Sequence, residues 1–310
     1  MPYSHVQIIG LVFVVFVANI PPVQAQDTPD AQVQSNIQFT LSGAAAHQYE
    51  TDIDDGGDLD VTRAGSELEV KVKVNEQVGV NSLFSYELSN YDFSGSTGFG
   101  GLDPWDNIHQ VMIRPAVTLA LDQQSMLFGS LMLILAKEDG ADENDSFTAG
   151  GAMTYRRRVS ETLNWGLGIT VMDQIEEDAM VLPVFILNWR FAEQWTLRTG
   201  SSRLATPRGF GVEVGWAFAE NWELAFGTHV QNRRFRLDGS GLAPDGVGEE
   251  TSIPVYAKLA YQINPNASVY LMGGVVAAGE VRLENSGGHK ISEQDYDPAG
   301  MIGVCMEVQF

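Results

Sequence analysis

The sequence has 310 residues, a formal net charge of -22 and 44% hydrophobic residues. This excess of acid argues against nucleic-acid binding, because phosphate contacts need Lys and Arg. The single cysteine, Cys305, excludes an internal disulfide, and no cofactor is predicted. No run of about 18 apolar residues occurs beyond the N-terminus, so helical membrane spans are not expected. A membrane β-barrel stays possible, since half of each barrel strand faces water.

The N-terminus has the pattern of a secretory signal peptide. Residues 8–20 are apolar, and small residues precede a cut after Ala25. We therefore predict a cleaved signal peptide over residues 1–25. A membrane anchor is the alternative, although the apolar run is short for a span. Residues 26–35 are polar and predict a short tail, which leaves residues 36–310 for an outer-membrane β-barrel.

The next part of the chain alternates between apolar and polar residues. A strand is predicted over residues 36–49, followed by an Asp-rich loop at 51–62. Residues 66–75 give the clearest alternation, with Leu and Val on one parity and mostly Glu and Lys on the other. A period of two predicts a strand with one apolar face. Residues 125–137 are predicted to form a strand that is apolar on both faces, with a short buried helix as the alternative.

The rest of the chain continues the alternation and brings the total to about fourteen strands, an even number that suits bacterial single-chain barrels. The further strands are predicted at residues 78–91, 108–121, 146–157, 163–172, 181–191, 195–204, 210–218, 222–237, 252–263, 267–283 and 299–310. Short connections fall on one side, at residues 76–77, 122–124, 160–161, 192–194, 219–221 and 264–266. Longer acidic loops fall on the other side. Such barrels have short periplasmic turns and longer external loops.

The last strand is apolar on one parity and ends the chain on an aromatic residue. This pattern looks like the C-terminal assembly signal of bacterial outer-membrane barrels. We assign the signal to Tyr296, Val304, Met306, Val308 and Phe310. Two near-identical turns, residues 191–195 and 218–222, carry Phe and Trp on both sides and predict an aromatic belt at the membrane–water interface. A soluble β-sandwich with aromatic cross-strand pairs is the structural alternative.

The opposite parity places charged residues inside the barrel. The predicted lumen charges are Arg114, Arg156, Arg190, Arg198, Glu213, Lys258 and Glu307. Charges of both signs need water or partners, and a barrel of about fourteen strands is wider than the kind that side chains fill. We therefore predict a polar, hydrated lumen. A basic wall facing an acidic wall is one interpretation, and plain solvated charge is the simpler one.

Five segments carry a resemblance to a known family. The two aromatic turns, residues 234–238, residues 243–250 and the tail 295–310 together resemble an uncharacterised family of bacterial outer-membrane β-barrel proteins, classed as a domain of unknown function. The resemblance implies a transmembrane, antiparallel up-and-down barrel in the cell outer membrane. It implies no substrate and no functional residues. The chain is also similar in strand number to fatty-acid-type transporter barrels but lacks room for their N-terminal plug.

Three functions compete. The first is a porin-like channel or small-solute uptake barrel, in which only residues 93–107 form a candidate inward lid. The second is a non-conducting structural or surface-binding barrel. Its acidic loops at 52–60 and 139–145 could bind Ca²⁺ through carboxylate oxygens, but neither matches the spacing of a calcium-binding loop.

The third function is an outer-membrane hydrolase. No motif ties the histidines to a nucleophile, so we predict no enzyme. The histidines that remain after cleavage are His47, His109, His229 and His289. The predicted partners are outer-membrane lipid, the barrel assembly machinery and small hydrophilic solutes.

Overall fold

Sixteen strands form one continuous sheet in a computed structural model that describes residues 36–200 and 210–310. The predicted signal peptide and polar tail lie outside the described residues, as does the predicted strand 195–204 beyond Gly200. Within those two ranges, no helix is long and apolar enough to span a membrane.

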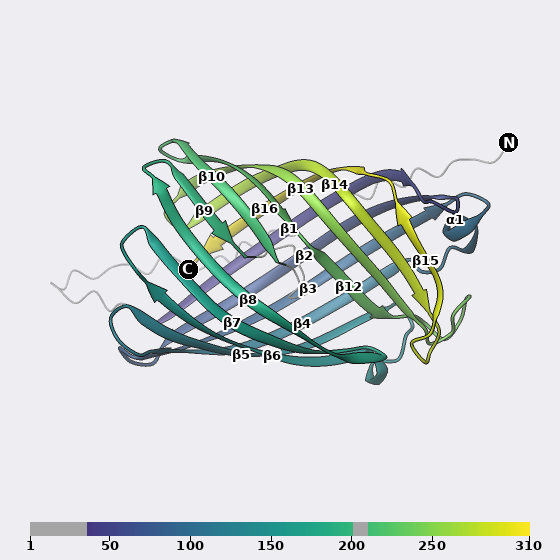
Figure 1. Cartoon of the computed structure of the whole chain (residues 1–310), viewed down its shortest axis with the longest axis horizontal. Helices are drawn as coiled ribbons and strands as arrows, with labels where there is room; N and C mark the ends of the chain where they lie inside the picture. The colour runs from purple at the N-terminus through teal and green to yellow at the C-terminus, as the bar shows by residue number, and fades with distance from the viewer. Residues whose placement is uncertain (1–35, 201–209) are drawn as a thin grey trace, which may run out of the picture. The chain divides into compact units, whose positions relative to one another are not determined.

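The strands follow one another around the sheet as antiparallel neighbours (Figure 1). Their bounds are β1 (Ile37–Asp52), β2 (Asp58–Lys73), β3 (Val78–Ser94), β4 (Asn107–Ala120), β5 (Ser125–Glu138), β6 (Phe147–Arg158), β7 (Leu163–Gln174), β8 (Glu177–Ala192), β9 (Trp195–Thr199), β10 (Gly211–Ala219), β11 (Trp222–His229), β12 (Gln231–Arg236), β13 (Val247–Asn264), β14 (Ala267–Glu284), β15 (Lys290–Tyr296) and β16 (Ala299–Gln309). A short helix, α1 (Gly98–Leu102), follows β3, and a 3₁₀ turn, η1 (Asn144–Ser146), precedes β6. Since β1 also pairs with β16, the sheet closes into a barrel.

The barrel has fourteen wall strands, as predicted. Strands β11 and β12 pair with two halves of the same strand, β13, and β16 and β15 pair with two halves of β14. The predicted strand 222–237 is therefore broken at Val230, between β11 and β12. A closed barrel satisfies the backbone hydrogen bonds internally, which is the condition for crossing hydrocarbon with strands.

The two faces of the sheet follow the predicted parity. On β16, Ile302 and Met306 are exposed on the outside, as is Phe310 directly after the strand, whereas Cys305 is buried on the inside. Exposed Leu, Val, Ile and Phe cover the outer face of most other strands in the same way. The fold is thus an all-β transmembrane barrel of the outer-membrane type.

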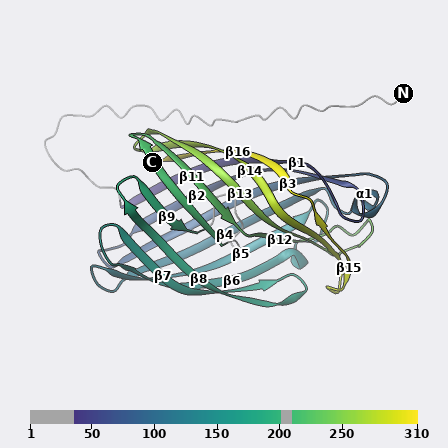
Figure 2. The ribbon, with the colours of Figure 1, turned by 45° about the horizontal axis from the view of Figure 1, so that its top comes forward.

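The two ends of the barrel differ, and Figure 2 shows both. One end, called here the turn end, carries the short hairpins predicted at residues 76–77, 122–124, 160–161, 192–194, 219–221 and 264–266. Trp195, Trp216, Phe218, Trp222 and Tyr261 form an unbroken row of ring contacts there, with centroids 4.5 to 6.5 Å apart. This row has the position expected of an aromatic belt. The opposite end, the loop end, carries the longer connections.

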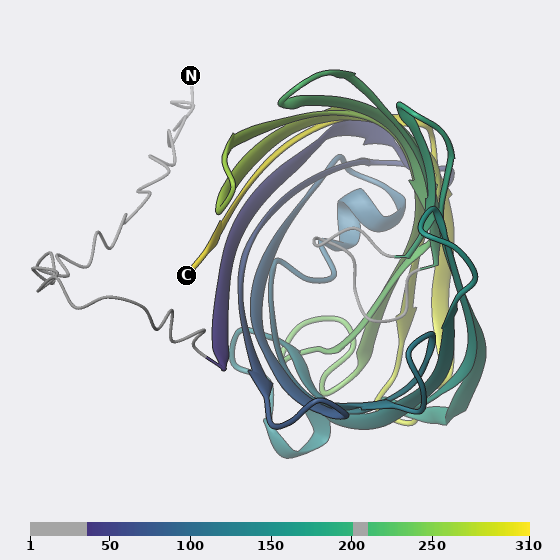
Figure 3. The ribbon, with the colours of Figure 1, turned by 90° about the vertical axis from the view of Figure 1, so that its left-hand side faces the viewer.

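Strand β12 leaves the wall at the loop end and crosses the interior (Figure 3). Beyond Val230 it stays paired with β13, and its last residue, Arg236, bridges to Lys137 of β5. On the other flank, Ile53 after β1 bridges to Tyr296 of β15. The loop end therefore contains a narrower ring made of β12 to β15 and β1 to β5, with β6 to β10 outside it.

This ring explains one difference from the sequence-based expectation and the double apolar face of one predicted strand. The Asp-rich loop is shorter than predicted, because β1 and β2 run on to Asp52 and from Asp58, and Leu59 and Val61 pack inside the ring. Residues 125–137 form the predicted strand, and the alternative of a short buried helix is wrong. Their second apolar face, which includes Met132 and Ile134, is buried in the same interior.

The final residue closes the barrel through its backbone. The amide of Phe310 donates to the carbonyl of Phe39 at 2.8 Å, and the amide of Phe39 donates back at 3.2 Å. Its side chain is 66% exposed on the membrane face. We expect Phe310→Ser to reduce the outer-membrane level of folded barrel several-fold, whereas Cys305→Ser leaves it near wild type. The heat-modifiable band on a gel measures both, and equal levels of the two variants would refute the prediction.

Candidate functional site

Five aromatic rings fill the barrel at its loop end. Tyr91 and Phe93 come from β3, Phe99 from α1, Trp105 from the loop before β4 and Phe235 from β12. All are buried, and neighbouring centroids lie 5.2 to 6.4 Å apart. We call this group the aromatic core. Because it belongs to the main buried apolar cluster, the loop-end interior is a dry core and not the hydrated lumen predicted from the charges.

The loop between β3 and β4, which the sequence analysis named as the candidate inward lid, folds into the barrel. Its entry depends on close backbone contact with the β1–β2 connection. The amide of Gly100 points at the carbonyl of Gly56, 3.5 Å away. A side chain on Gly100 would come within 1.9 Å of the Ser94 carbonyl, and Gly57 has a φ of +94°, so both positions require glycine. This tight seat holds α1 inside the barrel mouth.

A buried carboxylate, Glu250 on β13, ties opposite walls together. The residue is 1% exposed and accepts a bond from Arg63 of β2. It also accepts from the hydroxyls of Tyr91 at 2.7 Å and Tyr296 at 3.3 Å. Tyr296, assigned from the sequence to the assembly signal, therefore lies on β15 and faces the interior.

Strand β12 adds a second cation to this group. The Nη1 atom of Arg233 lies 4.0 Å from Glu250, and its Nε donates to Glu87 of β3 at 2.9 Å. We call Arg63, Glu87, Arg233 and Glu250 the central ion cluster. Charges buried to this extent are stable only when paired, so the cluster fixes β12 and β13 against β2 and β3.

Three carboxylates at the rim resemble a metal site. Ligand oxygens of Glu177, Glu249 and Glu284 lie within 4.8 Å of one another, the only such cluster in the described part of the chain. Arg234 binds Glu284 and lies 2.6 Å from Glu249, and Arg282 lies 3.8 to 4.0 Å from all three. Two guanidinium groups thus neutralise the acids. The loops at 52–60 and 139–145, considered for Ca²⁺, contribute nothing to this cluster.

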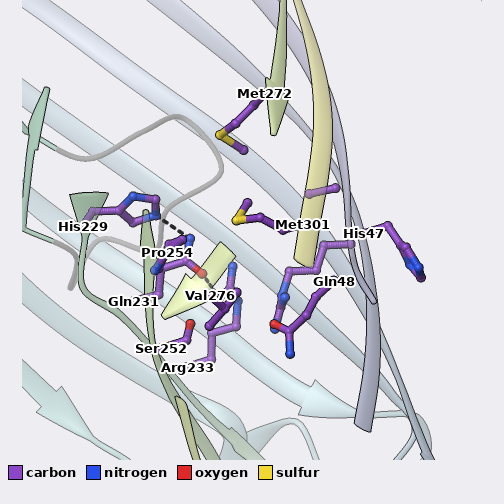
Figure 4. Close-up of a pocket in the computed structure, with 12 residues that line it drawn as sticks. His47, Gln48, His229, Gln231, Arg233, Ser252, Pro254, Met272, Val276 and Met301 are labelled. Carbon is purple, nitrogen blue, oxygen red and sulfur yellow. Dashed lines mark hydrogen bonds between the residues drawn. The ribbon is translucent and has the colours of Figure 1, made fainter. Parts of the chain in front are cut away.

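A small cavity lies beside the central ion cluster, and Arg233 of that cluster lines it together with His229 and Gln48 (Figure 4). Its volume is about 30 Å³, enough for about two water molecules. Gln48 is 3% exposed, and neither polar atom of its side-chain amide meets the geometry of a hydrogen bond within the described residues. The Nδ1 atom of His229 is likewise buried without a partner there. His47 contributes backbone only, since its ring points away from the cavity (Figure 4).

Three predicted lumen charges meet in one network nearer the turn end. Arg198 on β9 binds Glu213 at 2.7 Å and Glu223 at 2.5 Å, and Lys258 on β13 binds Glu213 at 2.6 Å. These contacts join neighbouring strands along one side of the barrel. Arg198 is consequently neutralised within its own wall and does not belong to a basic wall that faces an acidic one.

The other predicted lumen charges lie apart from that network. Arg114 and Arg156 are half-buried on the inner faces of β4 and β6, and Arg156 lies over the ring of Phe128 at 5.0 Å. Arg190 is exposed near the turn end of β8. Glu307 lies on the inner parity of β16, opposite Ser42 of β1.

The sequence reasoning missed the aromatic core and the central ion cluster. One signal was present, since Tyr91 and Phe93 are large side chains on the inward parity of β3. A second was the stretch Arg233, Arg234 and Arg236, which places three cations on one short segment. No sequence rule, however, pairs those cations with Glu87 or Glu250, more than a dozen residues away along the chain.

Comparison with known proteins gives a family and a fold. The model of a family described as "Domain of unknown function (DUF6268)" matches residues 28–299. No curated protein matches the sequence. Among solved structures, the toluene transporter TodX of P. putida is 9% identical, with a TM-score of 0.45, and the match covers 91% of this chain and 90% of that one.

Two porins are also similar in structure. The KdgM porin in complex with disordered oligogalacturonate is 10% identical, with a TM-score of 0.32 over 85% of this chain and 97% of that one. The NanC porin is 11% identical, with a TM-score of 0.34, and the match covers 85% of this chain and 98% of that one. Likenesses this distant indicate nothing about a ligand.

Proposed function

For this chain, which belongs to the DUF6268 family of domains of unknown function, we propose a role as an outer-membrane barrel that is closed to free diffusion at rest and binds small polar solutes from its turn end. The observation that carries the proposal is the aromatic core, which fills the loop-end interior. An open porin needs a continuous aqueous path, and a packed apolar interior excludes water.

The orientation and targeting complete the proposal. Short turns face the periplasm in barrels of this kind, so the loop end would face the outside and the turn end the periplasm. Residues 1–25 would direct export and be removed, and the barrel assembly machinery would insert the mature chain into outer-membrane lipid. Nucleic acid is not among the proposed partners, given the net charge of -22.

A catalytic role is not part of the proposal. His109 lies 2.9 Å from Asp139 and 2.8 Å from the Tyr86 hydroxyl, and His47 lies 3.5 Å from Asp60. Both histidines are on the outward parity of their strands, among residues that face the membrane interface. Histidine and tyrosine at that depth suit an interfacial belt.

A gated uptake barrel is the second candidate, favoured by the origin of the aromatic core. Phe99 and Trp105 belong to a connection that is not part of the wall. Displacing that connection would remove two of the five rings and leave every wall strand in place. The gating role of residues 96–105 can therefore be tested by replacing them, because every strand of the barrel wall is retained.

Single-channel conductance in a planar bilayer tests both candidates. We expect the wild-type barrel to show no stable conductance steps. The variant to compare replaces residues 96–105 with a short Gly/Ser linker and carries Phe235→Ala. Steps in this variant alone would support the gate, and silence in both would support the permanently closed binding barrel. Stable steps in the wild type would overturn the proposal of a closed barrel.

A further inference from the structure

The inner wall at the turn end carries cations that have no acid partner. Nearly every other inward or core arginine in the described ranges forms an ion pair, as Arg63, Arg198, Arg233 and Arg234 show. In the same ranges no carboxylate lies within 4.0 Å of Arg114, Arg156, Arg158 or Arg190, and the Nε atoms of Arg114 and Arg156 are buried without a hydrogen-bond partner. The chain has 40 acidic residues and 18 basic ones, so four inward arginines without an acid partner need an explanation.

Strand register aligns these cations with two amide side chains. Arg158 of β6 pairs with Asn164 of β7, and Asn164 pairs with Asn188 of β8. Paired residues point to the same face, so the three side chains form one inward row. Adjacent strands are about 4.8 Å apart, which gives the row a length of about 10 Å. Arg156 sits one inward position above Arg158 and extends the row.

A pocket of about 540 Å³ opens on this row. Arg156, Arg158, Asn164 and Asn188 all line it, together with Asp122 and Glu76 from two turns. This volume is within the range of small-molecule sites. It lies at the turn end, and it shares no lining residue with the aromatic core or with the small cavity beside the central ion cluster.

The two acids that line the pocket are already engaged elsewhere. The Oδ1 atom of Asp122 accepts the backbone amides of Gln124 at 2.7 Å and Ser125 at 2.8 Å. The Gln124 bond is the main cause that holds the pKa of Asp122 below its usual value. Glu76 accepts from Lys73 at 3.0 Å. Within the described residues, neither acid forms an ion pair with Arg156 or Arg158.

An aromatic ring packs against the guanidinium group of Arg156. This guanidinium lies 5.0 Å from the centroid of Phe128, two residues along β5 from the neighbour of Arg156. Stacking on a ring leaves the guanidinium N–H groups at the edge, where they are available to a planar anion. A guanidinium packed against a ring loses less side-chain entropy on binding than a free one.

We propose that this row is a binding site for small organic anions, in which Arg156 and Arg158 hold a carboxylate or phosphate group and Asn164 and Asn188 hydrogen-bond the polar remainder of the solute. Guanidinium groups bind both anions in bidentate geometry, and side-chain amides supply donors and acceptors to hydroxyl groups. The inference deepens the proposed function by giving the chemical class of the solute that enters from the turn end.

Isothermal titration of the refolded, detergent-solubilised barrel tests the site. The probes are inorganic phosphate and succinate, with erythritol as the uncharged comparison. We expect saturable binding of at least one anion, weaker at high ionic strength, and none of erythritol. The variant Arg156→Gln/Arg158→Gln should lose at least about tenfold in affinity, since hydrogen bonds to charged groups are strong.

Lys71→Gln is the matched control. Lys71 is an inward cation on β2 near the turn end, but it pairs with Glu69 at 2.9 Å and does not line the pocket. Its affinity for the anion should stay within about twofold of wild type. No anion binding, erythritol binding as strong as anion binding, or equal losses in Lys71→Gln and the double variant would each overturn the site.

Titration does not depend on conductance, so the two proposals fail separately. A wild-type barrel that conducts and still binds phosphate would remove the closed barrel and keep the anion site. A wild-type barrel that shows no conductance and binds neither anion would keep the closed barrel and remove the anion site. Retention of succinate alone would assign the site to carboxylates, and retention of phosphate alone would assign it to phosphorylated solutes.

Discussion

Replacing Glu250 with alanine is expected to lower the free energy of unfolding of the barrel by about 3–5 kcal/mol. The substitution removes the carboxylate that accepts bonds from Arg63, Tyr91 and Tyr296. Arg63 would then remain buried without its main counter-charge, and Arg233 would lose one of its two acids. An unpaired buried charge costs far more than the pair contributes, which is why the loss is large.

Urea titration of the refolded barrel measures this loss. The control is Glu293→Ala, which removes an equally charged side chain from half-exposed ion pairs with Arg282 and Lys290 at the loop end. Half-exposed pairs contribute at most about 1 kcal/mol. The variant Arg63→Met/Glu250→Met removes both charges and should recover most of the loss. Equal effects of Glu250→Ala and Glu293→Ala would contradict the structural role of the central ion cluster.

Phe99→Ala is expected to destabilise the barrel by about 3–5 kcal/mol, because it opens a cavity inside the aromatic core. Phe99 is 0% exposed and touches the rings of Phe93 and Trp105, with centroids 6.0 and 5.9 Å away. The helix that carries it is only five residues long, so little else holds the lid in place. Local unfolding of the lid should therefore accompany the loss.

Leu102→Ala is the matched control on the same helix. Leu102 is 41% exposed, and its truncation should change stability by less than about 0.5 kcal/mol. Urea titration gives the global effect, and limited proteolysis of the intact barrel reports opening of residues 95–106. Equal protease sensitivity of the two variants would show that the buried ring does not hold the lid.

The sequence by itself determined the barrel. Alternation with a period of two determines which face of each strand meets lipid. This pattern is local, so the outward position of residues such as Ile302 and Met306 can be predicted without knowing which residues are close to them in space. Turn residues and their spacing likewise determined the number of wall strands and the two different ends. The inward parity of Arg198, Glu213 and Lys258 followed from the same local rule.

Only the tertiary structure decided what the interior contains. Parity says that a side chain points inward, but not how far away the opposite wall is or which segment lies between. Strand β12 crosses to β5 because this path buries Phe235 in the aromatic core and pairs Arg233 with Glu87. Arg233 and Glu87 are 146 residues apart in the sequence. Pairing at that distance depends on closure of the whole sheet, which places the central ion cluster at the loop end and leaves Arg156 and Arg158 on a wall without acids.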